Sequence, residues 1–344
     1  MISRCAGVLL FALALFGSAG CGKGGEIHEA ADSGDVEKVK TILKSNPDLI
    51  SSRNPRGNTP LFHACDIETA VVLLAYKPDV NATNFFGETP LLHALHVGRA
   101  SVAELLLAHG AKVNLTTMDS SPLYATMMSC GKRTAPHLTE RLLALGADVN
   151  FKSQIGSQTA LHEAAMNDLT DCVKQLLAHG ADVNARDYEG ETPLYFASPE
   201  VMELLLSHGA DINYKNKRGQ TLLHQAMSSP NSRGSEFLLA HGAEINAKDN
   251  EGDTPLHIEA SYGYTDVARL LLTNHAAINI TNNNGETPLH IAALANRKDI
   301  AELLLANKAD INIKDNRGRT PLDSAMANNN RALAGFLREH GGHE

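Results

Sequence analysis

The chain has 344 residues, of which 43% are hydrophobic and 20% are charged, and its formal net charge is −9. This composition is that of an ordinary folded protein, and it argues against a disordered chain or one that lies mostly within a membrane. The acidic balance, the absence of tryptophan and the small number of aromatic residues argue against nucleic acid as a partner, because nucleic-acid-binding proteins usually present a basic face and rings for base stacking.

The first twenty residues have the pattern of an export signal. Arg4 gives a basic start, the segment from Val8 to Phe16 is apolar, and the small residues Ser18, Ala19 and Gly20 come before Cys21. The apolar run is too short to span a bilayer comfortably. We therefore expect residues 1–20 to be a signal peptide and the protein to be exported.

The segment Ala19-Gly20-Cys21 resembles the cleavage box of a bacterial lipoprotein, in which the cysteine is diacylated and becomes the new N-terminus. Ser18 departs from this pattern, which usually has an aliphatic residue three positions before the cysteine. We expect a periplasmic lipoprotein attached to a membrane through Cys21; a soluble exported protein and an uncleaved anchor are the alternatives. Residues 21–25 would then be a short tether, about 14 Å long from Gly22 to Gly25 when fully extended.

The rest of the chain repeats one unit. Its clearest copy begins at Asn250 and continues into an apolar run from Val267 to Leu272. Gly252 suits a tight turn with positive φ, Thr254 can cap a helix through its hydroxyl, and Pro255 suits the first helical position. Each copy therefore predicts a turn followed by two helices.

The capping residue recurs along the chain, and its last three steps are each 33 residues. A fixed period of this size indicates stacked units rather than one globular core. The equivalent positions are Thr59, Thr89, Ser121, Thr159, Thr192, Thr221, Thr254, Thr287 and Thr320.

These repeats resemble the ankyrin repeat family. The motif T-P-L-H is intact at residues 254–257 and 287–290, and endings such as His179-Gly180-Ala181 follow about twenty residues after each start. The resemblance covers roughly residues 26–344 and implies an all-α solenoid of antiparallel helix pairs with projecting β-turn fingers. We expect about ten repeats in one continuous domain, with an N-terminal cap at residues 26–58 and a C-terminal cap at residues 320–344.

Three spacings depart from the period by three residues or more. The steps from Thr59 and from Thr192 are 30 and 29 residues, and we place the shortfall in the turn between the two helices. The step from Ser121 is 38 residues, with four residues added between the helices within 128–137. Pro136 predicts that no continuous helix crosses this insertion.

Two slots hold unusual residues. Glu259 occupies a position that is alanine in the other repeats, and an isolated buried carboxylate would have a raised pKa. We expect its side chain to reach the edge of the groove; a role in a binding groove is the alternative. The left-handed position that ends the second helix, usually glycine, is Lys77, His275 or Lys308 in three repeats.

The sequence offers little catalytic or metal-binding chemistry. The fourth position of T-P-L-H is histidine in some repeats and Phe62 or Leu92 in others, so His162, His224, His257 and His290 are expected to hydrogen-bond the backbone rather than a metal. No nucleophile elbow, phosphate loop or dinucleotide motif is present, so neither a cofactor nor an enzymatic activity is expected.

The cysteines do not form a disulfide framework, because an odd number remains after Cys5 and Cys21. Cys65 and Cys172 occupy slots of small core residues. Cys130 lies outside the repeat register, and with His137 it is the basis of the hydrolase alternative. Three N-x-[ST] sequons, at Asn81, Asn114 and Asn279, share one repeat slot, and they are expected to reflect a structural asparagine rather than glycosylation.

We expect an unidentified protein partner to bind the tips of the fingers and the concave face of a monomeric protein. Most tips are polar and expected to be solvated, but Phe85, Phe86, Ile155 and Tyr188 are not, and aromatic anchors dominate binding energy. The segment from 85 to 188 is therefore the preferred site. The candidate binding residues are Phe85, Phe86, Met118, Asp119, Lys132, Arg133, Gln154, Ile155, Tyr188, Glu189, Lys217 and Arg218.

The sequence thus favours a non-enzymatic binding or scaffold module outside the cytoplasm. An inhibitor or immunity protein for an exported toxin is a more specific alternative. A hydrolase built on Cys130 and His137 is the least favoured.

Overall fold

The computed structural model describes residues 23–227 and 232–344, and these residues form helices and turns with no β-strand. The chain divides into two compact units, one ending at Gln154 and the other beginning at Ile155. This boundary lies within the irregular 38-residue step of the repeat. The predicted signal peptide and Cys21 lie outside the described residues. None of the helices described is both long enough and apolar enough to cross a membrane.

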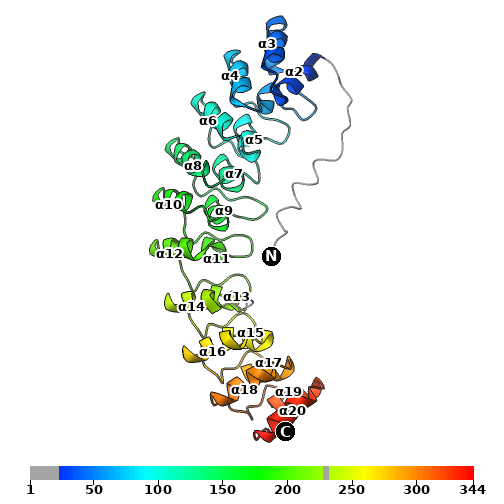
Figure 1. The fold of residues 1–344 in the computed structure, drawn as a ribbon, viewed down its shortest axis with the longest axis vertical. Helices are drawn as coiled ribbons and strands as arrows, with labels where there is room; N and C mark the ends of the chain where they lie inside the picture. Colours follow the sequence, from blue (N-terminus) through cyan, green and yellow to red (C-terminus); the bar gives the residue numbers. More distant parts are fainter. Residues whose placement is uncertain (1–22, 228–231) are drawn as a thin grey trace. The chain divides into compact units, whose positions relative to one another are not determined.

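Unit 1 contains four helix pairs within its described residues (Figure 1). The first helices of successive pairs pack on one another, as do the second helices of the first three pairs. The pairs are α2 (Lys23–Asp32) with α3 (Val36–Ser45), η2 (Pro60–His63) with α4 (Ile67–Ala75), α5 (Pro90–His96) with α6 (Ala100–Ala108), and α7 (Pro122–Ser129) with α8 (Ala135–Ala144). A further 3-10 turn, η1 (Pro47–Ser51), follows α3.

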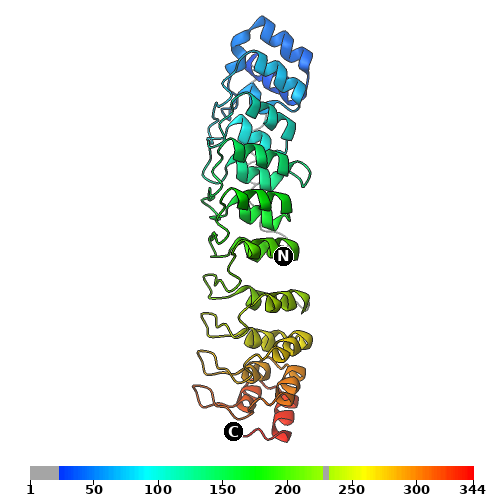
Figure 2. The ribbon, with the colours of Figure 1, turned by 90° about the vertical axis from the view of Figure 1, so that its left-hand side faces the viewer.

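Unit 2 contains six helix pairs within its described residues. In each unit the first helices lie on one side of the stack and the second helices on the other (Figure 1), while the turns project from one edge (Figure 2). The pairs are α9 (Ala160–Met166) with α10 (Thr170–Ala178), α11 (Pro193–Phe196) with α12 (Pro199–Ser207), α13 (Leu222–Ala226) with α14 (Ser232–Ala240), α15 (Pro255–Tyr262) with α16 (Thr265–Thr273), α17 (Pro288–Leu294) with α18 (Lys298–Ala306), and α19 (Pro321–Ala327) with α20 (Arg331–Glu339).

The predicted ten helix pairs and their all-α character are confirmed in these described residues. The first helices begin where the sequence predicts, because the capping hydroxyl accepts a backbone N–H of the first turn. Thr89 accepts from Leu92, Ser121 from Tyr124 and Thr320 from Asp323. Such caps stabilise a helix by about 1 kcal/mol each.

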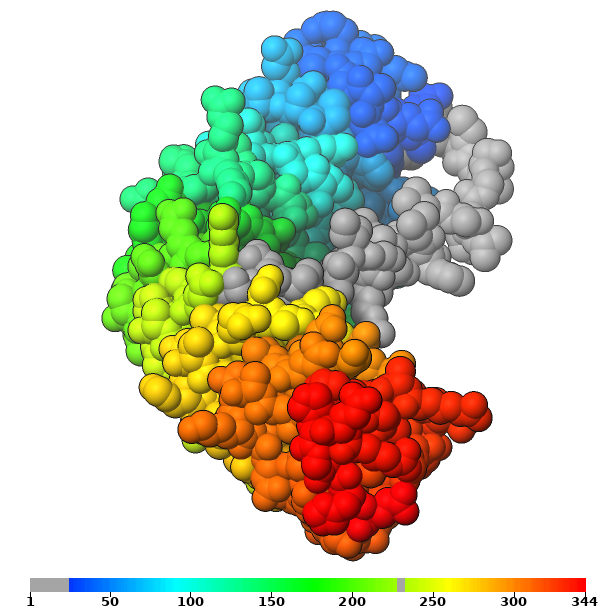
Figure 3. All heavy atoms as spheres, turned by 60° about the horizontal axis from the view of Figure 1, so that its bottom comes forward, coloured from blue at the N-terminus to red at the C-terminus, as the bar shows by residue number. Residues whose placement is uncertain are grey.

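The core of each unit is a column of leucines from the second helices. Burying one such side chain contributes roughly 1.5 to 3 kcal/mol, and each lies between neighbouring repeats. A pair therefore cannot bury its apolar face without the next pair. The fully buried members include Leu73, Leu106, Leu142, Leu176, Leu205, Leu271, Leu304 and Leu337. The last pair, α19 and α20, forms the exposed end of unit 2 (Figure 3).

The two short repeats differ from the prediction. Each keeps a connection of two or three residues between its helices, and it is the first helix that is shortened: η2 and α11 have four residues, against seven in α5 and α17. The connection cannot shrink further because it must reverse the chain direction. In the long repeat the expectation is confirmed, since α7 ends at Ser129 and α8 begins at Ala135 with Pro136 in its first turn.

The helix ends also agree with the sequence. Lys77, His275 and Lys308 adopt positive φ angles of 53°, 65° and 69°. The equivalent glycines of other repeats, such as Gly110 with φ of 84°, adopt this conformation without a Cβ clash.

Candidate functional site

Seven of the projecting turns, or fingers, are tight loops that are each held by one Asn or Asp side chain. In the ninth repeat Oδ1 of Asn282 accepts the backbone N–H groups of Asn284 and Glu286, both at 3.0 Å. Gly285 closes the turn with φ of 77°. The same arrangement is built on Asn54, Asn84, Asp187, Asn216, Asp249 and Asp315.

In unit 2, hydrogen bonds connect each finger to the next. The backbone N–H of Asn283 donates to the carbonyl of Glu251 at 3.1 Å, and its side-chain amide donates to the carbonyl of Asn250 at 2.9 Å. Asn250 and Asn316 make the same pair of bonds to their own neighbours. These polar tips are exposed to solvent, as expected, and their amides also connect each finger to its neighbour.

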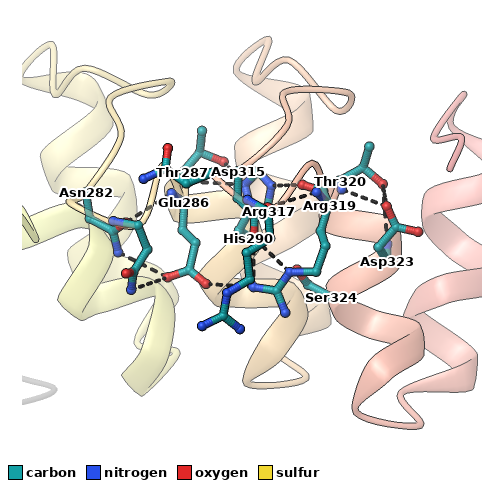
Figure 4. Close-up of polar contacts among 12 residues, drawn as sticks. Asn282, Glu286, Thr287, His290, Asp315, Arg317, Arg319, Thr320, Asp323 and Ser324 are labelled. Carbon is teal, nitrogen blue, oxygen red and sulfur yellow. Dashed lines mark hydrogen bonds and ion pairs between the residues drawn. The ribbon is translucent and has the colours of Figure 1, made fainter.

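Beneath the fingers of unit 2, the T-P-L-H histidines connect neighbouring repeats, as Figure 4 shows for His290. Nδ1 of His290 accepts the backbone N–H of Thr287 at 3.1 Å, and Nε2 donates to the carbonyl of Arg319 in the next repeat at 3.0 Å. His162, His224 and His257 make equivalent bonds, so their predicted role is confirmed.

Burial lowers the pKa of three of these imidazoles. The pKa of His257 falls to about 4, and the pKa values of His224 and His290 move in the same direction. Both ring nitrogens are occupied by protein groups, which leaves neither available as a ligand. No cluster of three or more His, Cys, Asp or Glu side chains suited to a metal ion occurs in the part of the chain that the structure describes.

The residue immediately before the capping threonine is a second connecting position, which the sequence analysis missed. In the tenth repeat the Arg319 guanidinium lies 2.7 Å from the Asp315 carboxylate and 3.5 Å from that of Glu286 (Figure 4). Burial opposes ionisation of Asp315, but hydrogen bonds from Arg319 outweigh it and lower its pKa. The signal in the sequence that could have revealed this position is that the residue before the capping threonine is polar in successive repeats.

In unit 1 the same slot is Glu88, which contacts two histidines. Its carboxylate oxygens lie 3.2 Å from Nδ1 of His93 and 2.9 Å from Nδ1 of His96. Burial raises the pKa of Glu88, but the hydrogen bonds from the two imidazoles outweigh that effect and bring it to about 2. This network fixes the base of the third finger against α5.

The asparagines of the three sequons are structural, as predicted. The side-chain amide of Asn114 donates to the carbonyl of Gly146 at 2.8 Å, and its Oδ1 accepts the N–H of Asp148 at 2.9 Å. Asn81 bonds Lys112 of the next repeat in the same way, and Asn279 bonds Asp310. Their amides thus connect one repeat to the next.

The candidate tips of unit 1 are exposed apolar side chains. Phe85, Phe86 and Met118 expose 72%, 71% and 70% of their surface. Asp119 beside them is half-buried, and Gln154 is exposed. The third and fourth fingers therefore present aromatic and thioether groups to solvent.

The candidate tips of unit 2 combine apolar and charged groups. Ile155 and Tyr188 expose 66% and 61% of their surface. The ammonium of Lys217 lies 3.9 Å from the centre of the Tyr188 ring, which joins the sixth and seventh tips by a cation–π contact. Glu189 and Arg218 are exposed beside them.

The remaining candidates, Lys132 and Arg133, lie apart from the fingers of unit 1. They are exposed in the loop between α7 and α8. In the same region the Cys130 side chain is buried, whereas His137 is exposed with Nδ1 2.8 Å from Oε1 of Glu104. A buried thiol is poorly placed to attack a substrate, which weakens the hydrolase alternative.

Glu259 does not reach the edge of a groove, so that expectation is wrong. Its side chain in α15 has no exposed surface; Oε1 accepts the backbone N–H of Tyr264 at 2.6 Å, and Oε2 has no hydrogen-bond partner. Burial raises its pKa to about 8. The Glu259 side chain lies deep inside the repeat stack and is too short for its carboxylate to reach water.

The cysteines also differ from one another. Cys172 is fully buried, as expected for a core slot. Cys65 is only half-buried, and its thiol lies 3.6 Å from the carboxylate of Asp66. Burial and the Asp66 charge raise the pKa of the Cys65 thiol, and a raised pKa makes a thiol less reactive.

The repeat geometry can now be compared with known proteins. A family model described as ankyrin repeats (3 copies) matches residues 27–117, 126–216, 198–282 and 260–344. The chain belongs to the ankyrin repeat family. Proteins of this family mediate protein–protein interactions and are generally not catalytic, which agrees with the exposed tips and with the structural use of the histidines.

Several curated proteins are similar over about half of this chain. Ankyrin repeat protein nuc-2 of Neurospora crassa is 27% identical over a match that covers 51% of this chain and 16% of the relative. Human inversin is 29% identical, and its match covers 52% of this chain and 17% of inversin. The E3 ubiquitin-protein ligase XBAT33 of Arabidopsis thaliana is 32% identical, and its match covers 49% of this chain and 38% of XBAT33. The match thus covers well under half the length of each relative, and the similarity supports the repeat family rather than their individual activities.

Proposed function

We propose that this ankyrin protein is a non-enzymatic binding module that acts outside the cytoplasm and holds a protein partner through its fingertips and inner helical face. Five large apolar side chains at the tips support this proposal most directly: Phe85, Phe86 and Met118 in unit 1, and Ile155 and Tyr188 in unit 2. Leaving such side chains in water is unfavourable unless a partner covers them.

The inner face suits a rigid binding surface. Asparagine side chains bridge the seventh to tenth fingers of unit 2, and histidine bridges such as that of His290 connect neighbouring repeats beneath them. A pre-organised surface loses little conformational entropy on binding, so more of the contact energy appears as affinity.

The proposed location is supported by the first 21 residues. The basic Arg4, the apolar segment from Val8 to Phe16 and the small residues before Cys21 fit an export signal with a lipid-attachment cysteine. A diacylated Cys21 would hold the binding module at a membrane surface.

A crosslinking pull-down from the envelope fraction tests the binding function. We expect Phe86→Ala and Tyr188→Ala to reduce recovery of the partner at least tenfold, because each removes an exposed aromatic anchor. Glu251→Ala is the matched control, since Glu251 occupies the slot of Phe86 in the eighth finger and is polar. Unchanged recovery with both aromatic variants, at unchanged melting temperature, would contradict the proposal.

Metabolic labelling with radioactive palmitate tests the anchor. The wild-type chain should incorporate label and fractionate with membranes, and Cys21→Ser should lose both properties. Label that persists in Cys21→Ser would show that the lipid is attached elsewhere or that no lipoprotein processing occurs.

A further inference from the structure

The sixth repeat lacks the bridge that the other T-P-L-H repeats of unit 2 share. Its fourth position is Tyr195 rather than histidine, and the Tyr195 hydroxyl bonds the side chain of Gln225 instead of a backbone carbonyl. Between this finger and the seventh one lies a recess of about 270 Å³, including its opening to solvent. About 20 Å³ of it is wide enough for a group of the size of a water molecule.

The walls of this recess suit a small cation. Glu191 and Asp211 are the ionisable acids in its lining, the rings of Tyr195 and Tyr214 form part of its sides, and no basic residue lines it. The guanidinium of Arg186 already lies over the face of the Tyr214 ring, 4.5 Å from the ring centre. Tyrosine rings and carboxylates together attract ammonium groups.

Glu191 lacks the charged neighbours that two of its equivalents have. It occupies the slot before the capping threonine, where Glu88 contacts two histidines and Glu286 contacts Arg319. Within the described residues Glu191 forms no ion pair, and its neighbour is the Tyr195 hydroxyl. Burial, and to a smaller extent the nearby charges of Asp187 and Glu189, raise the pKa of Glu191. The hydrogen bond from Tyr195 and the charge of Arg218 offset this increase only in part. Within the described residues, the half-buried carboxylate of Glu191 therefore has no ion-pair partner in contact with it.

We propose that the recess between the sixth and seventh fingers binds the ammonium group of a lysine side chain presented by the protein partner. This inference rests on the proposed function, because the partner supplies the lysine. An ammonium is about as large as a water molecule and fits the narrow part of the recess, whereas the planar guanidinium of arginine is wider. The ammonium would contact Glu191 and the ring of Tyr195.

Phage display of random twelve-residue peptides against the full chain in detergent provides the probe. Enriched peptides should share a lysine, and the dissociation constant of one such peptide is then measured by fluorescence anisotropy. Replacing its lysine with norleucine, which keeps the carbon chain and removes the charge, should weaken binding at least tenfold. The variant Glu191→Gln should weaken the lysine peptide to the same extent and leave the norleucine peptide unaffected.

Glu286→Gln is the matched control, because it changes the same slot where Arg319 already lies nearby; it should leave both affinities unchanged. Equal binding of the two peptides, enrichment of peptides without lysine, no enrichment at all, or an equal loss with Glu286→Gln would overturn the inference. The pull-down with Phe86→Ala and Tyr188→Ala tests the proposed function separately, so failure of the lysine site and failure of the binding function give different results.

Discussion

At the scale of single residues, the T-P-L-H histidines can connect repeats only while their rings are neutral. Nδ1 accepts a backbone N–H and Nε2 donates to a carbonyl, as in His290 with Thr287 and Arg319. A protonated ring carries hydrogen on both nitrogens and loses the acceptor. Protonation therefore breaks the bond that orients the ring.

This geometry predicts that the protein loses stability in mild acid. The folded pKa of His257 is about 4 against an ordinary 6.5, so the unfolded chain binds more protons and stability falls as pH drops from 6.5 towards 4. The loss from His257 alone should reach about 3 kcal/mol. Urea unfolding at pH 7, 5.5 and 4.5 measures it. His257→Leu should be less stable at pH 7 but lose less on acidification; an identical pH dependence would contradict the argument.

Glu259 predicts the opposite dependence on pH. Its folded pKa of about 8 exceeds the ordinary 4.5, so its contribution is most favourable below pH 4.5 and is lost as pH rises towards 8. Glu259→Gln removes the charge and should raise the free energy of unfolding by about 3 kcal/mol at pH 7 and by little at pH 5. The exposed Glu203 in α12 is the control position, and a Glu203→Gln change should not alter the pH profile. A gain from Glu259→Gln that is equal at both pH values would indicate a packing effect instead.

At the scale of elements, the fingers depend on close approach between their backbones as well as on turn chemistry. A Cβ added to Gly252 would lie 2.5 Å from Oδ1 and 2.6 Å from the backbone N of Asn283. At Gly318 a Cβ would meet nothing within 4 Å, although its φ of 77° is nearly that of Gly252, 79°. Alanine substitutions at these two glycines therefore distinguish the cost of backbone strain, present at both positions, from the cost of a clash with the next finger, present only at Gly252.

We expect Gly318→Ala to lower the free energy of unfolding by about 1 kcal/mol, which is the typical penalty for alanine at positive φ. Gly252→Ala should lose a further 1 to 3 kcal/mol, because the Asn283 backbone cannot move aside without breaking its bond to the Glu251 carbonyl. Urea unfolding of both variants measures these two losses in the free energy of unfolding. Equal losses would mean that the fingers have room to separate.

At the scale of the molecule, the charge is unevenly divided. Residues 155–344 contain 25 acidic and 16 basic residues and so carry the whole net charge of −9, while residues 1–154 are balanced. A long acidic segment attracts basic partners and repels acidic ones at low salt. This distribution agrees with a partner that presents lysine to unit 2.

Stability within each unit should be shared between neighbouring repeats, because each pair buries its leucines only against the next. Leu271→Ala in α16 should lower the free energy of unfolding by 2 to 5 kcal/mol. Hydrogen exchange should then accelerate most in α16 and in α14 and α18, which both contact α16, and less in α10. Uniform acceleration across unit 2 would show instead that the unit opens as one cooperative block.

The sequence by itself determined the local structure of this protein. Thr-Pro starts, glycines at positive φ and periodic leucines predicted the helix pairs and their number, because capping, turn formation and burial of a helix face depend on residues close together in the chain. The exposure of Phe85, Phe86, Ile155 and Tyr188 followed from their place in the turns.

Only the tertiary structure decided how neighbouring repeats use those residues. It showed that Asn250, Asn283 and Asn316 hold the row of fingers, that Glu259 is buried without a partner for one oxygen, and that Glu191 faces a recess without a cation. The contacts between fingers join residues about thirty positions apart. A pattern in one repeat cannot reveal them, because their energies depend on the distance and orientation of the next repeat.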